Sequence, residues 1–336
     1  MDAETIAMRL GLGADVTPWL KEIAELPDTG LRLPAPQDAA EALQPFAPLP
    51  QDAAELAALW PDDSWPREAL WLVERMYARI VADVDNDPWM WRDWPRLDHV
   101  DDARVRCAPV FAFAAAVPLL RARHARHGVP AEVTAATLAD MGRHLAQTRT
   151  MLGRCGLETS TWMALHYRGG LYELGRLQYE PGRLGPIGAV TWYGPGQDED
   201  LAPELRPGQP TLRLHIPQDG PLDPAAVQDS LRRARPFFAE HFDTDVAVAT
   251  CTSWLLDPTL ARYLPADSNI LAFQRLFTLI DDDGADGDGD VFRFVFRHPR
   301  VDLDAVPQRT RLERAVVAHL RGGGHWRVRT GWLRLP

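Results

Sequence analysis

Hydrophobic residues recur at helical spacing through the first half of the chain. Apolar positions three or four residues apart run through 68–84, 105–128 and 131–156, and shorter stretches of the same period cover 6–12 and 52–60. Proline-rich segments such as LRLPAPQ and QPFAPLPQ separate these stretches, as expected where helices end. The pattern predicts an all-α domain over residues 1–152.

The hydrophobic period changes to two after Gly156. Residues 160–180 predict two strands around a Gly-Gly turn, and further strands are predicted at 188–193, 211–217, 245–256, 277–281, 290–297 and 325–335. Asp223 and Pro224 predict the start of a helix that runs to Phe242, with shorter helices at 258–265, 268–277 and 311–324. This irregular order predicts a mixed-sheet α/β domain over residues 153–336, so the fold class is α followed by α/β.

Length, composition and charge narrow the class of protein. A chain of 336 residues with 46% hydrophobic and 25% charged residues is typical of a folded two-domain protein. Its net charge of -11 repels a phosphate backbone, so we expect no nucleic acid partner. Lys21 is the only lysine, an arginine bias typical of high-GC bacterial genomes. Because the sequence shows neither a signal-peptide pattern nor an apolar run of membrane-spanning length, we expect a bacterial, cytoplasmic protein with no membrane partner.

Cysteines and metal-binding patterns give little sign of a metal or a disulfide. Cys107, Cys155 and Cys251 are odd in number and far apart, which indicates free thiols. The acidic loop at 281–290 lacks the spacing of a calcium loop, and His124 and His127 lack a third ligand nearby in the sequence. We therefore expect no metal.

Four short motifs of the second half resemble a known family. GRLQYE at 175–180, LHIP at 214–217, SWLLDP at 253–258 and DSNI at 267–270 occur in its order. The chain resembles bacterial acyltransferase-domain proteins, which pair a helical N-acyltransferase N-terminal domain with a GNAT-like C-terminal domain. The resemblance implies acyl transfer from a thioester donor, either acyl-CoA or an acyl carrier protein, to an amine of a small metabolite or peptide.

The resemblance also implies where the donor binds. The strand Leu212–Ile216 would separate from its neighbour, and the backbone of Leu214 and Ile216 would pair with the pantetheine arm. The loop Pro217–Pro224 would place backbone N–H groups and a helix N-terminus around the CoA pyrophosphate, with Gln218 and Gly220 as its donor-binding residues.

The loop after this strand departs from the superfamily pattern. An Arg or Gln followed by two spaced glycines is usual there, whereas this chain has Asp219 and Asp223 beside Gln218 and Gly220. Each carboxylate would oppose an anion by roughly 1 kcal/mol at an exposed site. A carrier-protein thioester, or another donor without pyrophosphate, therefore stays an alternative to acyl-CoA.

Three residues are candidates for the chemistry. His215 lies in the donor strand and is the candidate base, with a buried histidine bonded to backbone as the structural alternative. Cys251 in the next strand could pair with His215 as a nucleophile, although a small apolar core residue is the commoner role of a free cysteine. Ser253 shares the face of Cys251 and is a candidate acid for the leaving thiolate.

The acceptor pocket has four candidates. Arg176 and Gln178 are an even interval apart, so in one strand they share a face that lines either an acceptor cleft or solvent. Trp254 is either a pocket wall or core filler, and Asn269 is either a polar anchor or a helix cap. Two other functions stay open: a non-catalytic ligand-binding or regulatory GNAT-like module, and a Cys251-dependent thiol transferase or hydrolase.

Overall fold

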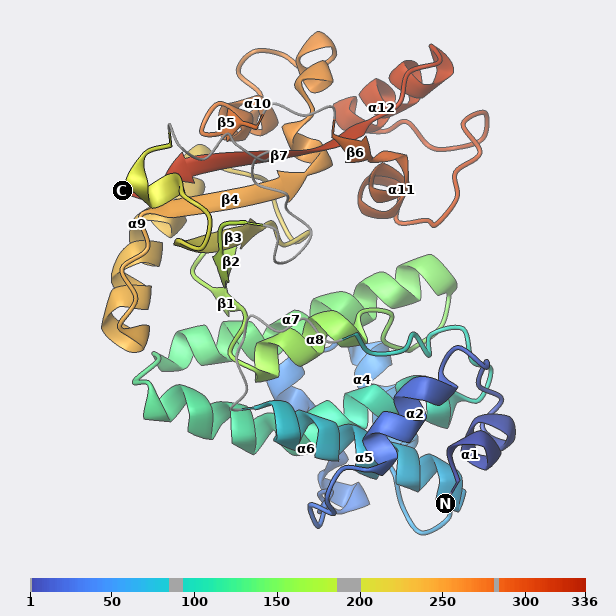
Figure 1. Cartoon of the computed structure of the whole chain (residues 1–336). Coiled ribbons are helices and arrows are strands. Elements are labelled where there is room, and N and C mark those ends of the chain that lie inside the picture. The colour runs from blue at the N-terminus through green and yellow to red at the C-terminus, as the bar shows by residue number, and fades with distance from the viewer. Residues whose placement is uncertain (1, 85–92, 186–200, 281–283) are drawn as a thin grey trace. The chain divides into compact units, whose positions relative to one another are not determined.

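The computed structural model describes residues 2–84, 93–185, 201–280 and 284–336 (Figure 1). It divides into two compact units, Met1–Tyr172 and Glu173–Pro336. The strand predicted at 188–193 lies outside the described residues. Each unit is described by itself below.

The first unit is helical, as the apolar period predicts. Its two longest helices are α6 and α7, and short 3₁₀ turns at Pro36–Asp38 and Gln44–Phe46 join the smaller helices. The helices are α1 (Ala3–Arg9), α2 (Thr17–Ala24), α3 (Ala39–Leu43), α4 (Pro50–Ala58), α5 (Arg67–Asp83), α6 (Ala103–Arg126), α7 (Ala131–Leu152) and α8 (Ser160–Tyr167).

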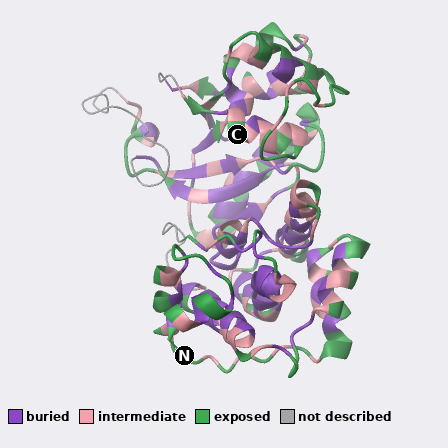
Figure 2. Cartoon of the chain, turned by 90° about the vertical axis from the view of Figure 1, so that its right-hand side faces the viewer, coloured by how far each residue is buried: buried purple, intermediate pink, exposed green. Residues whose placement is uncertain are grey.

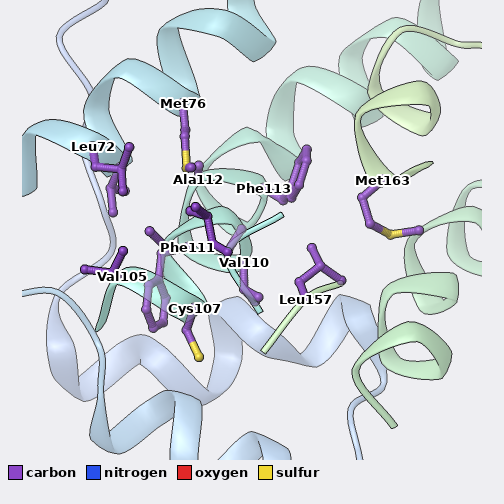
Figure 3. Close-up of a cluster of buried hydrophobic side chains, with 14 of the residues drawn as sticks. Leu72, Met76, Val105, Cys107, Val110, Phe111, Ala112, Phe113, Leu157 and Met163 are labelled. Atoms are coloured by element: carbon purple, nitrogen blue, oxygen red, sulfur yellow. The ribbon is translucent and has the colours of Figure 1, made fainter. Parts of the chain in front are cut away.

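Helix α6 runs through the core of this unit. Figure 3 shows side chains from its whole circumference, among them Val105, Phe111 and Phe113, packed against Leu72 and Met76 of α5. By length and composition alone α6 is apolar enough to cross a membrane, contrary to the prediction that the chain has no apolar run of that length. Because 72% of its most apolar stretch is buried inside the structure, it has the burial expected of a core helix.

The segment expected to open the second domain belongs to the helical unit. Residues 160–167 form α8 rather than a strand, because Met163, Ala164 and Tyr167 are spaced to bury one helical face in the first core. Gly169, with φ of 68°, follows the end of this helix instead of forming a hairpin turn. The boundary predicted at residue 153 is therefore one helix too early.

The second unit is a mixed seven-stranded sheet with helices, as predicted for this half. The strand order is β1-β2-β3-β4-β7-β5, and β6 also pairs with β7. The strands are β1 (Tyr172–Glu173), β2 (Gln178–Arg183), β3 (Pro210–His215), β4 (Val248–Ser253), β5 (Thr278–Leu279), β6 (Ala285–Asp286) and β7 (Arg327–Arg334). The helices are α9 (Pro224–Phe242), α10 (Asn269–Gln274), α11 (Asp288–Val291) and α12 (Arg311–Arg321), with 3₁₀ turns at Pro203–Leu205, Trp254–Leu256 and Pro258–Arg262.

Helix α9 covers one face of β2, β3 and β4. The Ser230 hydroxyl of α9 lies 3.1 Å from the Tyr179 hydroxyl of β2, and Tyr179 is paired across the strands with Leu214 of β3. Partners in a ladder point to the same side, so tyrosine and leucine both face the helix. Figure 2 shows the resulting buried band along the strands of this unit.

Two strand predictions near the C-terminus need correction. Residues 290–297 were predicted to form a strand, yet they form the end of α11 and a π-helix at Phe292–Phe296. The reason is that buried Val291 and its partners Val295 and Phe296, at helical spacing, pack into one cluster around Trp326. The strand expected to be short at 325–335 is the longest in the sheet and lies between β4 and β5.

The contact between α7 and the turn Gln44–Phe46 allows a test of the helical unit. A Cβ added at Gly142 would lie 2.3 Å from the Phe46 carbonyl oxygen and 2.5 Å from that of Ala47. We expect Gly142→Ala to lower the free energy of unfolding by about 2 kcal/mol, because backbone must move apart. Helix propensity alone predicts the opposite sign, a gain of about 1 kcal/mol.

Urea denaturation of the full chain measures this difference. The matched control is Ala135→Gly on the exposed face of the same helix, which should cost only the propensity term of about 1 kcal/mol. An increase in stability for Gly142→Ala would show that α7 does not approach the turn this closely.

Candidate functional site

The two parallel strands at the middle of the sheet pair over a short length. β3 pairs with β4 through Leu212 with Ala249 and Arg213 with Thr250, and the ladder ends there. β3 is nevertheless paired with β2 as far as His215, and β4 with β7 as far as Ser253. The carboxyl ends of β3 and β4 therefore separate from each other while each stays held by its outer neighbour, and β4 points toward α11 (Figure 1).

A buried carboxylate lies between two basic side chains beside this separation. Glu180 of β2 has a side chain that is 4% exposed, and its Oε2 lies 2.8 Å from Nε2 of His215. Its other oxygen, Oε1, accepts a hydrogen bond of 2.5 Å from Nη2 of Arg213. Because a carboxylate only accepts, His215 donates through Nε2 and its Nδ1 carries the lone pair in the neutral ring. This is the arrangement of a histidine base oriented by an acid.

The basic and acidic groups share the face of the sheet opposite α9. Cross-strand pairing of Gln178 with His215 and of Glu180 with Arg213 puts all four side chains on one side. The parallel pair Arg213 and Thr250 extends this side onto β4. Gln178, expected as a pocket residue, donates to the Glu173 carboxylate at 3.2 Å and is 3% exposed. Gln178 is therefore a buried hydrogen-bonding residue beneath the polar face and does not line an open pocket.

Cys251 lies on the other face of β4. It is one residue after Thr250, which shares the side of Arg213, so its thiol points toward α9 and away from His215. The side chain is 2% exposed, and burial raises the pKa of the thiol to about 12. Such a group stays protonated at neutral pH, and the pairing of Cys251 with His215 that the sequence suggested is wrong.

The remaining predicted residues of this region have structural positions. Ser253 ends β4 and caps the turn Trp254–Leu256 that follows. Its Oγ accepts a hydrogen bond from the backbone N–H of Leu255. Trp254 is buried in the cluster around Trp326. Asn269 is exposed and is the first residue of α10, whose N-cap position is taken by Ser268. Asn269 is therefore not the helix cap.

The loop between β3 and α9 is built from the residues expected to hold the donor. Leu214 is buried on the α9 face, and Ile216 is half-buried where the loop begins. Gly220 is exposed, and Gln218 donates from its amide to the Phe294 carbonyl of the π-helix. Asp223 is the N-cap of α9, since its side chain accepts from the Ala226 N–H at 2.9 Å.

Arg176 does not line a strand face as predicted. It lies in the turn between β1 and β2, and its guanidinium donates to the carbonyl oxygens of loop residues Pro217, Gly220 and Pro221. Because Arg176 is not part of a strand, the prediction that it shares a strand face with Gln178 is wrong. Among the described residues, no three His, Cys, Asp or Glu side chains are grouped in a way that could hold a metal ion.

The sequence matches two domain families in the order that these units have. The profile of the N-acyltransferase N-terminal domain matches residues 37–169, and that of the GNAT-like C-terminal domain matches residues 171–333. An acyltransferase solved in complex with decanoyl-CoA and teicoplanin is 38% identical over 100% of both chains, with a TM-score of 0.86. The chain belongs to this family of acyltransferases.

Two further solved structures agree with this assignment. A mutant acyltransferase in complex with octanoyl-CoA is 37% identical, and an acyltransferase in complex with CoA and 10C-teicoplanin is also 37% identical. Both cover 100% of each chain, with a TM-score of 0.87. A search of curated proteins gives no match.

The sequence prediction did not include two residues of this candidate site, Glu180 and Arg213. Each lies two positions from a residue that was singled out, Gln178 and His215, and so lies on the same face of its strand. That spacing is a signal that the sequence does contain. What the sequence lacks is the cross-strand register, which puts Glu180 opposite Arg213 and brings the carboxylate, the guanidinium and the His215 imidazole together.

The burial of Cys251 gives a test that separates its two roles in the acyltransferase. Because the thiol is buried and its pKa is about 12, we expect native protein at pH 8 to leave Cys251 unmodified by iodoacetamide. We also expect Cys251→Ala to keep the transfer rate within about twofold. Peptide mass spectrometry and initial rates measure the two effects. An acyl adduct on Cys251 after exposure to an acyl thioester would contradict the structural role and support Cys251 as a nucleophile.

Proposed function

We propose that the protein transfers an acyl group from acyl-CoA to an amine, with His215 as the general base and Glu180 as the group that orients it. The observation that carries the proposal is the hydrogen bond that Nε2 of His215 donates to the Glu180 carboxylate at the end of β3, where the strand separates from β4. The relatives solved with octanoyl-CoA, decanoyl-CoA and CoA support acyl-CoA as the donor.

The separation of the strands gives the donor a place to bind. An unpaired strand edge exposes backbone N–H and C=O groups. The amides of a pantetheine arm can form hydrogen bonds with these groups. In this arrangement the arm lies beside Leu214 and Ile216, and the thioester lies near His215. The β3 backbone then acts as a template for the donor.

The reaction is direct aminolysis of the thioester. The amine nitrogen attacks the thioester carbonyl carbon, and Nδ1 of His215 takes the proton that the nitrogen loses. The tetrahedral intermediate collapses when the carbon–sulfur bond breaks, and the CoA thiolate receives the proton from the imidazolium. The Glu180 carboxylate stabilises the imidazolium that forms in between, while Arg213 holds the other carboxylate oxygen.

An amine on a glycopeptide or small metabolite is the proposed acceptor. The relatives solved with teicoplanin and with 10C-teicoplanin support a molecule of this size and class. An amine is chosen over a hydroxyl because a neutral amine is the stronger nucleophile toward a thioester carbonyl and can attack before it loses its proton.

A pair of acceptors tests the nature of the attacking group. We expect the protein with octanoyl-CoA to add one acyl group to a glycopeptide that carries a primary amine, and to leave the N-acetylated form of the same glycopeptide unchanged. Mass spectrometry of the acceptor and release of CoA thiol measure the two products. Acylation of the N-acetylated form at a hydroxyl would contradict the amine acceptor, and transfer confined to carrier-protein thioesters would contradict the donor.

Substitution of the base tests the mechanism. His215→Ala should lower turnover about 10²-fold or more, because the amine then loses its proton to water. Glu180→Gln keeps the shape of the side chain but removes the charge that stabilises the imidazolium, so we expect a smaller loss of about tenfold. Initial rates with saturating octanoyl-CoA measure both losses.

The matched control is His298→Ala, since His298 is exposed and lies outside the site. Thermal melts of every variant show whether the fold is retained, which matters for Glu180→Gln because Arg213 loses its carboxylate. Wild-type turnover in folded His215→Ala would remove His215 from the mechanism.

A further inference from the structure

The turn between β1 and β2 sends one arginine into the loop that follows β3. The turn closes through a hydrogen bond of 3.0 Å from the Leu174 N–H to the Leu177 carbonyl, and Gly175 allows it with a φ of 83°. Arg176 follows at the tip, and its side chain is only 10% exposed. An arginine at a hairpin tip is ordinarily solvated, so its burial against the loop indicates a positioning role.

The guanidinium binds the loop at three backbone points. Nε donates to the Pro221 carbonyl at 2.8 Å, and Nη2 donates to those of Gly220 at 2.6 Å and Pro217 at 3.1 Å. The planar fork of five N–H donors suits this task, because one side chain can hold several carbonyls in fixed directions. The loop from 217 to 221 is therefore wrapped around Arg176.

These contacts fix the direction of the peptide N–H groups as well. In a planar trans peptide, the carbonyl of one residue and the N–H of the next point in opposite directions. Because the carbonyls of Pro217 and Pro221 point at Arg176, the N–H groups of Gln218 and Leu222 point away from it. The side of the loop away from Arg176 therefore offers the N–H groups of Gln218 and Leu222 to an anion.

Arg176 also offsets the negative charge of Asp219 in this loop. Nη1 of Arg176 lies 3.6 Å from Oδ1 of Asp219, and the Asp223 carboxylate is engaged as the cap of α9. The sequence alone suggests that Asp219 and Asp223 repel a phosphate. In the structure Asp219 lies beside Arg176, and Asp223 accepts a hydrogen bond from the Ala226 N–H. The usual glycine-rich pattern is thus replaced by an arginine from another strand pair.

We infer that Arg176 is the positioning residue for a diphosphate site in the loop 217–222, which receives the diphosphate of the acyl-CoA donor. The inference rests on the proposed function, since it supposes a CoA donor. Arg176 acts through the loop: it holds the carbonyls away from the anion and neutralises Asp219, and the outward N–H groups bind the phosphate oxygens.

Two donors that differ only beyond the pantetheine arm test this role. Octanoyl-CoA carries the diphosphate and the adenosine 3′-phosphate, and octanoyl-pantetheine lacks both. Octanoyl-dephospho-CoA keeps the diphosphate without the 3′-phosphate, so an equal loss of affinity for octanoyl-CoA and octanoyl-dephospho-CoA assigns the effect away from the 3′-phosphate. We expect Arg176→Met to raise the dissociation constant of octanoyl-CoA tenfold or more and to leave that of octanoyl-pantetheine within about twofold. Isothermal titration calorimetry of the full chain measures both constants and needs no acceptor.

A second variant separates the charge on Asp219 from the shape of the loop. Asp219→Asn added to Arg176→Met should recover part of the lost octanoyl-CoA affinity, because the unneutralised carboxylate no longer repels the diphosphate. The matched control is Arg232→Met, an exposed arginine of α9 that pairs with Asp229. It should leave both dissociation constants unchanged.

The possible outcomes are distinct. An equal loss of affinity for both donors in Arg176→Met shows general damage to the hairpin and overturns the inference, as does unchanged octanoyl-CoA binding. Either result leaves the proposed function intact as long as the wild-type chain binds octanoyl-CoA. If the wild type binds octanoyl-pantetheine and octanoyl-CoA equally well, the diphosphate has no site and the inference fails on its own. Absence of wild-type binding to either donor overturns the proposed donor and the inference together.

Discussion

The early end of pairing between β3 and β4 is the constraint on which the rest of the second unit depends. Two neighbouring parallel strands normally stay paired, because unpaired backbone groups are costly. Here β3 is paired along its whole length with β2, and β4 along its whole length with β7. Each strand therefore keeps its direction without the other. The open edge is therefore compatible with both strands being held in the sheet, and a ligand can satisfy its backbone groups.

The buried Glu180 carboxylate depends in turn on the register of these strands. A lone buried carboxylate is strongly unfavourable, so Glu180 is tolerated only because Arg213 lies directly opposite and His215 lies two residues further along β3 on the same face. A slip of β2 by one residue along β3 would turn Glu180 to the α9 face and leave Arg213 and His215 on the other face. Packing of Tyr179 against α9 prevents that slip, so the apolar face holds the polar face in register.

The sequence predicted those features whose residues lie within a few positions of one another, and it did not predict contacts between distant segments. Helix α9 was predicted correctly because Asp223 and Pro224 mark its start within a few residues. Residues 160–167 were assigned wrongly because a short apolar stretch fits both periods, and only burial in the first core decides between them. His215 was found from its place in the strand, whereas Glu180 and Arg176 act on segments 35 and about 40 residues away. A single sequence does not encode such pairings in any local pattern.

The two faces of the sheet also separate the parts of the site. Cys251 and Leu214 lie on the face that α9 covers, while His215, Arg213 and Glu180 lie on the other. A base on one face can take a proton only from an acceptor that approaches on that face, so a donor held along the edge of β3 would be attacked from the side opposite α9. The diphosphate end would then lie where β3 leads into α9, at the loop that Arg176 holds. In the proposed arrangement β3 sets the direction of both substrates: its edge holds the donor, its face carries the base, and its carboxyl end leads into the loop for the diphosphate.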